Sequence, residues 1–174
     1  MLFGRRRKEQ IHAQAVGLMN EWNGIITASG GITFGMSEDE LENMDESELM
    51  PMLAEYAMAL LGVLTYMVAG LNHVDAAQEM IEIFKKIYAT YPEEMNPEGI
   101  TPNEAASRVN TYYQKATAVS ETLMGQGKGL PDITRAHAES IFKWLDTGTS
   151  EDDVAFVENC LNIFYKDTYE KYYG

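Results

Sequence analysis

The feature that most constrains the fold is a run of sixteen residues without a charge, Tyr56–Leu71, inside a strongly acidic chain. As a helix this run would measure about 24 Å, which is shorter than the roughly 30 Å hydrocarbon core of a bilayer. No Lys or Arg occurs from residue 9 to residue 84 to anchor a membrane span. We therefore expect no membrane span, and predict that a buried helix at about residues 51–70 forms the centre of a soluble bundle.

Apolar residues recur at helical spacing along most of the chain, and no alternating run of β-branched residues predicts a strand. With 174 residues, 45% of them hydrophobic, the chain can bury one contiguous core. We predict an all-α fold, a single domain over residues 1–174, with six or seven helices around the central apolar one. The first apolar stripe, in residues 5–28, consists of Ile11, Ala15, Leu18, Trp22 and Ile25.

Capping signals predict where three helices begin. A Ser or Thr hydroxyl followed three residues later by a carboxylate is the pattern of an N-terminal capping box. Three such pairs occur: Ser37 with Glu40, Thr101 with Glu104, and Ser150 with Asp153.

Glycines predict where helices end and where backbones approach each other. Gly70 is expected to end the central helix, and Asn72 to begin the next one as its N-cap. Gly62 and Gly70 are both expected to let neighbouring backbones pack closely. The expected helices cover residues 5–28, a short acidic stretch after 37, about 51–69, 74–91, 102–123, 134–146, and 151 to the C-terminus.

A basic cluster, Arg5–Lys8, stands apart from the rest of the chain. The chain has 13 Lys and Arg against 27 Asp and Glu, so only nine basic residues remain outside this cluster. No apolar segment follows it as in a signal peptide, so we expect a cytoplasmic protein. At a helix N-terminus these charges oppose the helix dipole, and two outcomes stay open. Residues 1–8 either fray or dock on an acidic surface, including that of a second copy in a homo-oligomer.

The acidic residues concentrate in residues 38–48, where there is no base. If this stretch formed one helix it would span about 16 Å, and its charge density would approach that of duplex DNA. Such a segment is either a solvated face or a binding surface for a basic protein. The candidate partner-binding residues are Glu38, Asp39, Glu40, Glu42, Asp45, Glu46 and Glu48.

The histidines do not form a recognisable catalytic or metal motif. Glu9 and His12 have the i, i+3 spacing used by di-iron bundles, but those sites need a second such motif, and the chain has none. His73 and His137 have no serine or cysteine partner at a recognisable spacing. The glycine-rich loops match no phosphate or dinucleotide fingerprint. We expect no catalytic residue, no metal site and no cofactor.

Glu55 is the one carboxylate close to the uncharged run, and it defines the alternative function. An enclosed carboxylate needs a partner or a raised pKa, which can mark a functional site. A helical-bundle enzyme, or a binder of a small ligand or metal, would then be centred on Glu55. The simpler interpretation places its carboxylate in solvent with its stem packed.

These observations favour a non-enzymatic protein that binds a basic partner as an inhibitor, an immunity-type antagonist or an adaptor. In a sharper form of this hypothesis it is a nucleic-acid mimic that occupies the basic groove of a nucleic-acid enzyme, as phage anti-defence proteins do. With a formal charge of −14 the chain should repel nucleic acid itself.

Overall fold

Every regular element in the computed structural model, which describes residues 2–174, is helical. This part of the chain forms seven α-helices and two short 3-10 turns, and contains no strand. The all-α fold and the number of helices expected from the apolar spacing are therefore confirmed. The helices are α1 Leu2–Ala28, α2 Glu38–Glu42, α3 Glu46–Gly70, α4 Val74–Tyr88, α5 Pro102–Gly125, α6 Leu130–Trp144 and α7 Glu151–Tyr173, with 3-10 turns at Ser29–Gly31 and Glu93–Met95.

Helix α3 runs through the middle of the fold and contains most of the uncharged run. Helices α1, α4, α5, α6 and α7 all contact it, and its side chains from Tyr56 to Thr65 are all buried. It is the only described helix long and apolar enough to cross a membrane, yet 72% of its most apolar window is buried in the structure. A helix that is apolar on all sides is stable in a globule when its neighbours enclose it. The prediction of a central apolar helix is confirmed.

The three predicted capping boxes form at the N-termini of α2, α5 and α7. In each, the hydroxyl accepts a hydrogen bond from the backbone N–H three residues later, and the carboxylate there accepts one from the N-cap N–H. Each box satisfies two backbone donors that a helix end leaves free. These helices therefore start where the local sequence predicts.

The central helix starts earlier than expected, and Asn72 has a different role. Helix α3 begins at Glu46, so Pro51 lies inside it, where its missing N–H deprives only the exposed Ser47 carbonyl of a helical partner. Asn72 is not the N-cap of α4, because it adopts a left-handed conformation with φ 66°. The following N–H, from His73, bonds to the Val68 carbonyl at 3.3 Å, which makes Asn72 the residue that ends α3.

The start of α6 and the end of α4 also differ from the prediction. Helix α6 begins at Leu130 instead of residue 134, because Pro131 falls in the first turn, where a missing N–H costs no helical bond. Helix α4 ends at Tyr88 instead of residue 91, and its last carbonyls bond to N–H groups of the turn that follows.

Helices α3 and α5 cross at Gly62. A Cβ placed on Gly62 would lie 2.5 Å from the Cβ of Tyr112 and 2.9 Å from the backbone N of Tyr113. Only a glycine leaves room for this approach, so the expected close packing at Gly62 is confirmed. At Gly70 nothing lies within 4 Å of such a Cβ, and the same expectation is wrong there.

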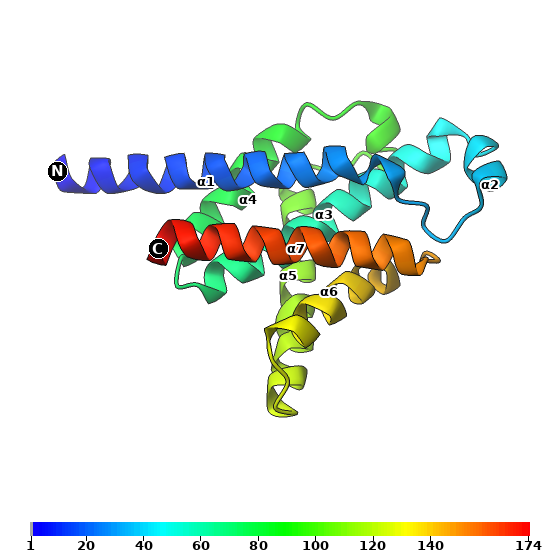
Figure 1. Cartoon of the computed structure of the whole chain (residues 1–174). Helices are drawn as coiled ribbons and strands as arrows, with labels where there is room; N and C mark the ends of the chain where they lie inside the picture. Colours follow the sequence, from blue (N-terminus) through cyan, green and yellow to red (C-terminus); the bar gives the residue numbers. More distant parts are fainter. Residues whose placement is uncertain (1) are drawn as a thin grey trace.

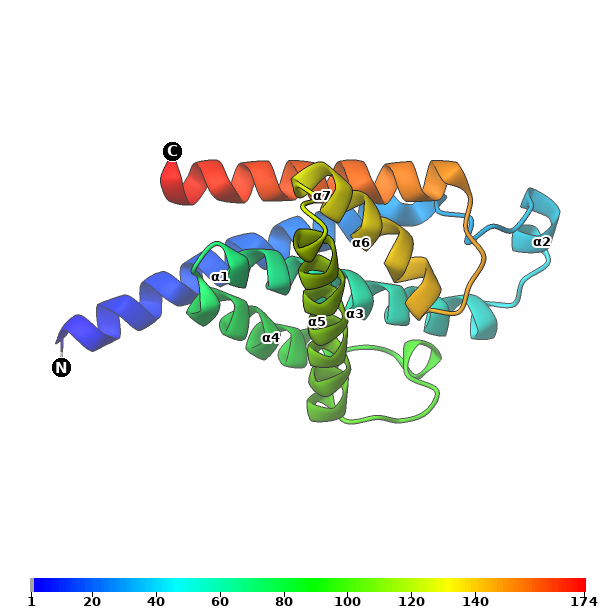
Figure 2. The same cartoon turned by 90° about the horizontal axis from the view of Figure 1, so that it is seen from below.

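The long helices α1 and α7 run side by side in opposite directions, as Figure 1 shows. The start of α1 extends past the C-terminal end of α7 and away from the other helices (Figures 1 and 2). Residues 3–10, which we call the arm, are all exposed. The basic cluster Arg5–Lys8 lies within this arm and is helical, as part of the first turns of α1. Fraying was one of the two expectations for it.

Candidate functional site

The seven acidic side chains expected to bind a partner lie at one end of the molecule. They belong to α2, to the start of α3 and to the link between them, opposite the end where the N-terminus lies (Figures 1 and 2). All seven are exposed. We call this set the acidic segment: Glu38, Asp39, Glu40, Glu42, Asp45, Glu46 and Glu48.

The acidic segment is not the single helix considered from the sequence. Helix α2 ends at Glu42, because both the backbone N–H and the side-chain amide of Asn43 donate to the Asp39 carbonyl and close its last turn. Helix α3 then begins at Glu46 in a new direction (Figure 2). The acidic residues are therefore carried by two short stretches, and a linear row of charges about 16 Å long is not formed.

The acidic segment has no basic partner within the described chain. None of the ten ion pairs among residues 2–174 involves any of its seven carboxylates. Elsewhere about half of the acidic side chains form ion pairs, and Arg135 alone bonds to Glu139, Glu151 and Glu158 at 2.8, 2.7 and 3.2 Å. The helix dipoles of α2 and α3 favour acidic residues in their first turns, but they supply no mobile counter-charge. The negative charge of this end therefore faces solvent.

Glu55 is not free in solvent, because two side chains from α5 bind its carboxylate. Tyr112 donates its hydroxyl to Oε1, and Arg108 donates to Oε2 at 3.2 Å. Arg108 also donates to Glu98 at 2.7 Å, and this bond, more than any other contact, raises the pKa of the guanidinium. Burial, followed by the bond to Glu55, raises the pKa of the Tyr112 hydroxyl.

The space beside Glu55 is small. The cavity next to it, between α3, α5 and the loop after α4, measures about 60 Å³, which is room for a few water molecules. Both oxygens of the carboxylate already accept hydrogen bonds from α5. This arrangement is a cross-link between α3 and α5, so the Glu55 carboxylate is bound by α5 although its side chain is still 28% exposed.

A buried serine–histidine pair connects α5 and α6. The Ser120 Oγ lies 2.8 Å from Nε2 of His137, and both residues are 0% exposed. Burial lowers the pKa of His137 to about 4, so the imidazole is neutral at pH 7. The sequence shows no serine at a recognisable spacing from His137, and the tertiary structure supplies one from another helix. The two residues are 17 positions apart on different helices, and no local motif marks them.

The Ser120–His137 pair lacks the features of a nucleophile and its base. Nδ1 of His137 has no hydrogen-bond partner, so no carboxylate orients the ring, and no solvent reaches the hydroxyl. The ring of Tyr66 covers the imidazole with its centroid 5.5 Å away. The pair is a polar contact enclosed in the core.

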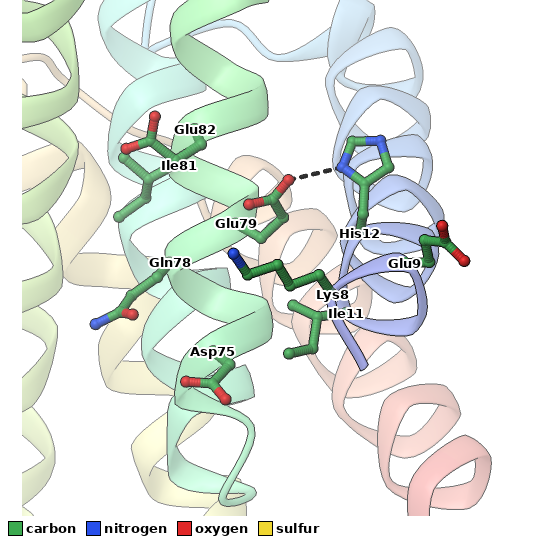
Figure 3. A pocket seen from close by; sticks show the side chains of 9 residues that line it. All are labelled: Lys8, Glu9, Ile11, His12, Asp75, Gln78, Glu79, Ile81 and Glu82. Carbon is green, nitrogen blue, oxygen red and sulfur yellow. Dashed lines mark hydrogen bonds and ion pairs between the residues drawn. The ribbon is translucent and has the colours of Figure 1, made fainter. Parts of the chain in front are cut away.

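Glu9 and His12 do not converge on a common site. Nδ1 of His12 lies 2.6 Å from Glu79 of α4, as Figure 3 shows, while the Glu9 carboxylate accepts from Arg5 at 3.0 Å. Residues 2–174 contain no group of three His, Cys, Asp or Glu side chains placed to hold a metal ion.

Comparisons with protein-family models, curated proteins and solved structures find no match to this chain.

Proposed function

We propose that this chain is a non-enzymatic cytoplasmic protein that binds a basic surface of another protein through its acidic segment. The observation that supports this most is the contrast in pairing. Of the 20 carboxylates outside the acidic segment, ten form ion pairs among the described residues, whereas the seven in the acidic segment form none and are all exposed.

The position of the acidic segment supports the same proposal. It lies at an end of the molecule, away from the central packing, so a partner can reach it without displacing another helix (Figure 1). A compact group of like charges steers an oppositely charged partner toward it and raises the association rate. A basic groove that normally binds nucleic acid would fit this end, which gives the sharper form of the proposal, an antagonist of a nucleic-acid enzyme.

The test compares two neutralised variants of equal charge in affinity capture from the native host. In one, five carboxylates of the acidic segment become amides, while Glu40 of the capping box and Asp45 at the N-cap of α3 are kept: Glu38→Gln, Asp39→Asn, Glu42→Gln, Glu46→Gln and Glu48→Gln. The matched control neutralises five exposed carboxylates elsewhere: Glu93→Gln, Glu94→Gln, Glu121→Gln, Asp132→Asn and Asp152→Asn.

The proposal requires a basic protein that is retained by the wild type and by the control but lost with the first variant. Its purified form should bind more weakly as salt rises from ~50 to ~500 mM, because screening shortens the reach of exposed charges. Equal capture by both variants would contradict the proposal, as would an affinity that does not change with salt.

The alternative of an enzyme or small-ligand binder at Glu55 has less support. The carboxylate is engaged by Tyr112 and Arg108, and the adjacent cavity of about 60 Å³ is too small for an organic substrate. Stoichiometric iron, manganese or zinc in the purified protein would favour this alternative.

A further inference from the structure

The arm is a stretch of helix with little to hold it. Residues 3–10 are all exposed, and the Phe3 side chain is 89% exposed. Four consecutive bases, Arg5–Lys8, stand at the positive end of the helix dipole, which disfavours them. The arm forms two ion pairs, Arg5 with Glu9 inside it and Arg7 with Asp75 of α4, and both are exposed and contribute little. A helical end of this composition is marginal in water unless a further surface covers it.

Next to the arm is a groove with the opposite charge. It lies between α1 and α4, has a volume of about 870 Å³, and is the hollow drawn in Figure 3. Its α4 side carries three carboxylates, Asp75, Glu79 and Glu82, and its α1 side carries Glu9 and Lys8. Each α4 carboxylate has one ion-pair partner, in Arg7, His12 and Lys85 respectively, and those pairs are partly exposed. Ile11 and Ile81 give it an apolar, half-buried lining. The groove thus offers both an apolar contact and negative charge.

We infer that two copies of this chain associate by exchanging arms, so that the arm of each copy lies in the α1–α4 groove of the other. The exposed Phe3 ring would pack on Ile11 and Ile81. The arginines of the arm would face the α4 carboxylates. An apolar anchor surrounded by complementary charges is the arrangement that stable protein interfaces use.

Helix α1 forms both the arm and one wall of the groove. This favours the arm of a second copy of the chain as the occupant of the groove. The arm cannot fill its own groove, because it continues along α1 away from the body and its last part, Lys8 and Glu9, already forms the groove wall (Figures 1 and 2). Two α1 helices that pack antiparallel at their starts place each arm over the other groove at the same time. Such an interface is isologous and closes as a two-fold dimer.

The experiment measures the molar mass of the full chain by sedimentation equilibrium at low salt. The wild type should approach twice its chain mass of 19.5 kDa and dissociate as salt is raised. Two charge-reversed variants, Arg5→Glu/Arg6→Glu in the arm and Glu79→Arg/Glu82→Arg in the groove, should each raise the dissociation constant about tenfold or more. Phe3→Ala should also weaken the dimer.

Mixing the two charge-reversed variants provides the decisive measurement. In a heterodimer of these two, the reversed arm faces the reversed groove and the wild-type arm faces the wild-type groove, so an equimolar mixture should recover the dimer that each variant alone forms only weakly. Circular dichroism checks that both are folded. The matched controls are reversals of exposed charges elsewhere, Lys128→Glu/Lys143→Glu and Glu93→Arg/Glu94→Arg, which should leave the dimer intact.

Three results would overturn the inference: a monomeric wild type at low salt, an arm variant that dimerises like the wild type, or a mixture that stays monomeric. A monomeric wild type that sediments with anionic lipid vesicles through its arm would assign the arm to a membrane surface instead. The inference does not involve the acidic segment, so its failure leaves the proposed function untouched.

Discussion

The hydroxyl oxygen of Ser120 lies 2.8 Å from Nε2 of His137, in a contact between α5 and α6 from which water is excluded. Ser120 can satisfy the imidazole at Nε2, but Nδ1 has no partner. A proton added to Nδ1 would place a charge in the core with no acceptor for it. The pair is therefore compatible only with a neutral histidine.

This pair predicts that the protein loses stability in mild acid. Burial lowers the pKa of His137 from about 6.5 to about 4, so between these values the unfolded chain binds a proton that the folded chain does not. The free energy of unfolding should then fall as pH drops from about 6.5 to about 4, by up to about 3 kcal/mol from this group. Urea unfolding at several pH values measures this loss of stability.

The control for this pH effect is a double variant, Ser120→Ala/His137→Leu. Replacing both partners with apolar side chains leaves no unsatisfied group and should be nearly neutral at pH 7. Its stability should decline less with acid than that of the wild type. If the two proteins lose the same free energy between pH 6.5 and pH 4, His137 is not the cause.

Replacing Gly62 with alanine should destabilise the protein by about 2 kcal/mol, because the new methyl group meets the Tyr112 Cβ and the backbone of α5. The cost should appear even though alanine favours helix over glycine by about 1 kcal/mol. The matched control is Gly24→Ala in α1, where nothing lies within 4 Å of the added Cβ. That change should instead stabilise by roughly 0.5–1 kcal/mol. Thermal unfolding of both variants tests the contrast in sign.

Because the Tyr112 hydroxyl donates to Glu55, its removal should lower the free energy of unfolding. Tyr112→Phe keeps the ring but leaves Glu55 Oε1 without its donor, and should cost about 1.5–3 kcal/mol. Tyr113→Phe, one residue further on, should change stability by less than about 0.5 kcal/mol. Equal effects of the two substitutions in chemical denaturation would argue against a structural role for this hydrogen bond.

Asp153 should matter far more than its neighbour Asp152. The buried Asp153 carboxylate accepts hydrogen bonds from the backbone N–H and the hydroxyl of Thr33, at 3.0 and 3.1 Å, and so attaches the loop after α1 to the start of α7. We expect Asp153→Ala to cost about 2–3 kcal/mol, because it leaves partly buried donors of Thr33 unsatisfied and removes a capping box. Asp152→Ala removes only an exposed first-turn acid, worth about 0.3–1 kcal/mol. Hydrogen exchange at Thr33 should rise in the first variant alone.

Short-range features of the sequence predict the fold well. Ser37, Thr101 and Ser150 begin their helices as expected, because a capping box is formed by residues three positions apart and needs no tertiary contact. The central position of α3 also follows from its lack of charge. The limits of α3 and α6 differ from the prediction, because each helix contains a proline, Pro51 or Pro131, within its first two turns, where a proline disrupts little.

The sequence by itself determined the all-α class, the capped helix starts and the uncharged helix at the centre. These features depend on residues within about one turn of each other or on the overall polarity of a segment. Only the tertiary structure paired Ser120 with His137 and bound Glu55 to α5. It also left the acidic segment without a basic partner and placed the groove next to the arm. These relationships join different helices, and their distances depend on how the helices pack, which spacing along the chain does not encode.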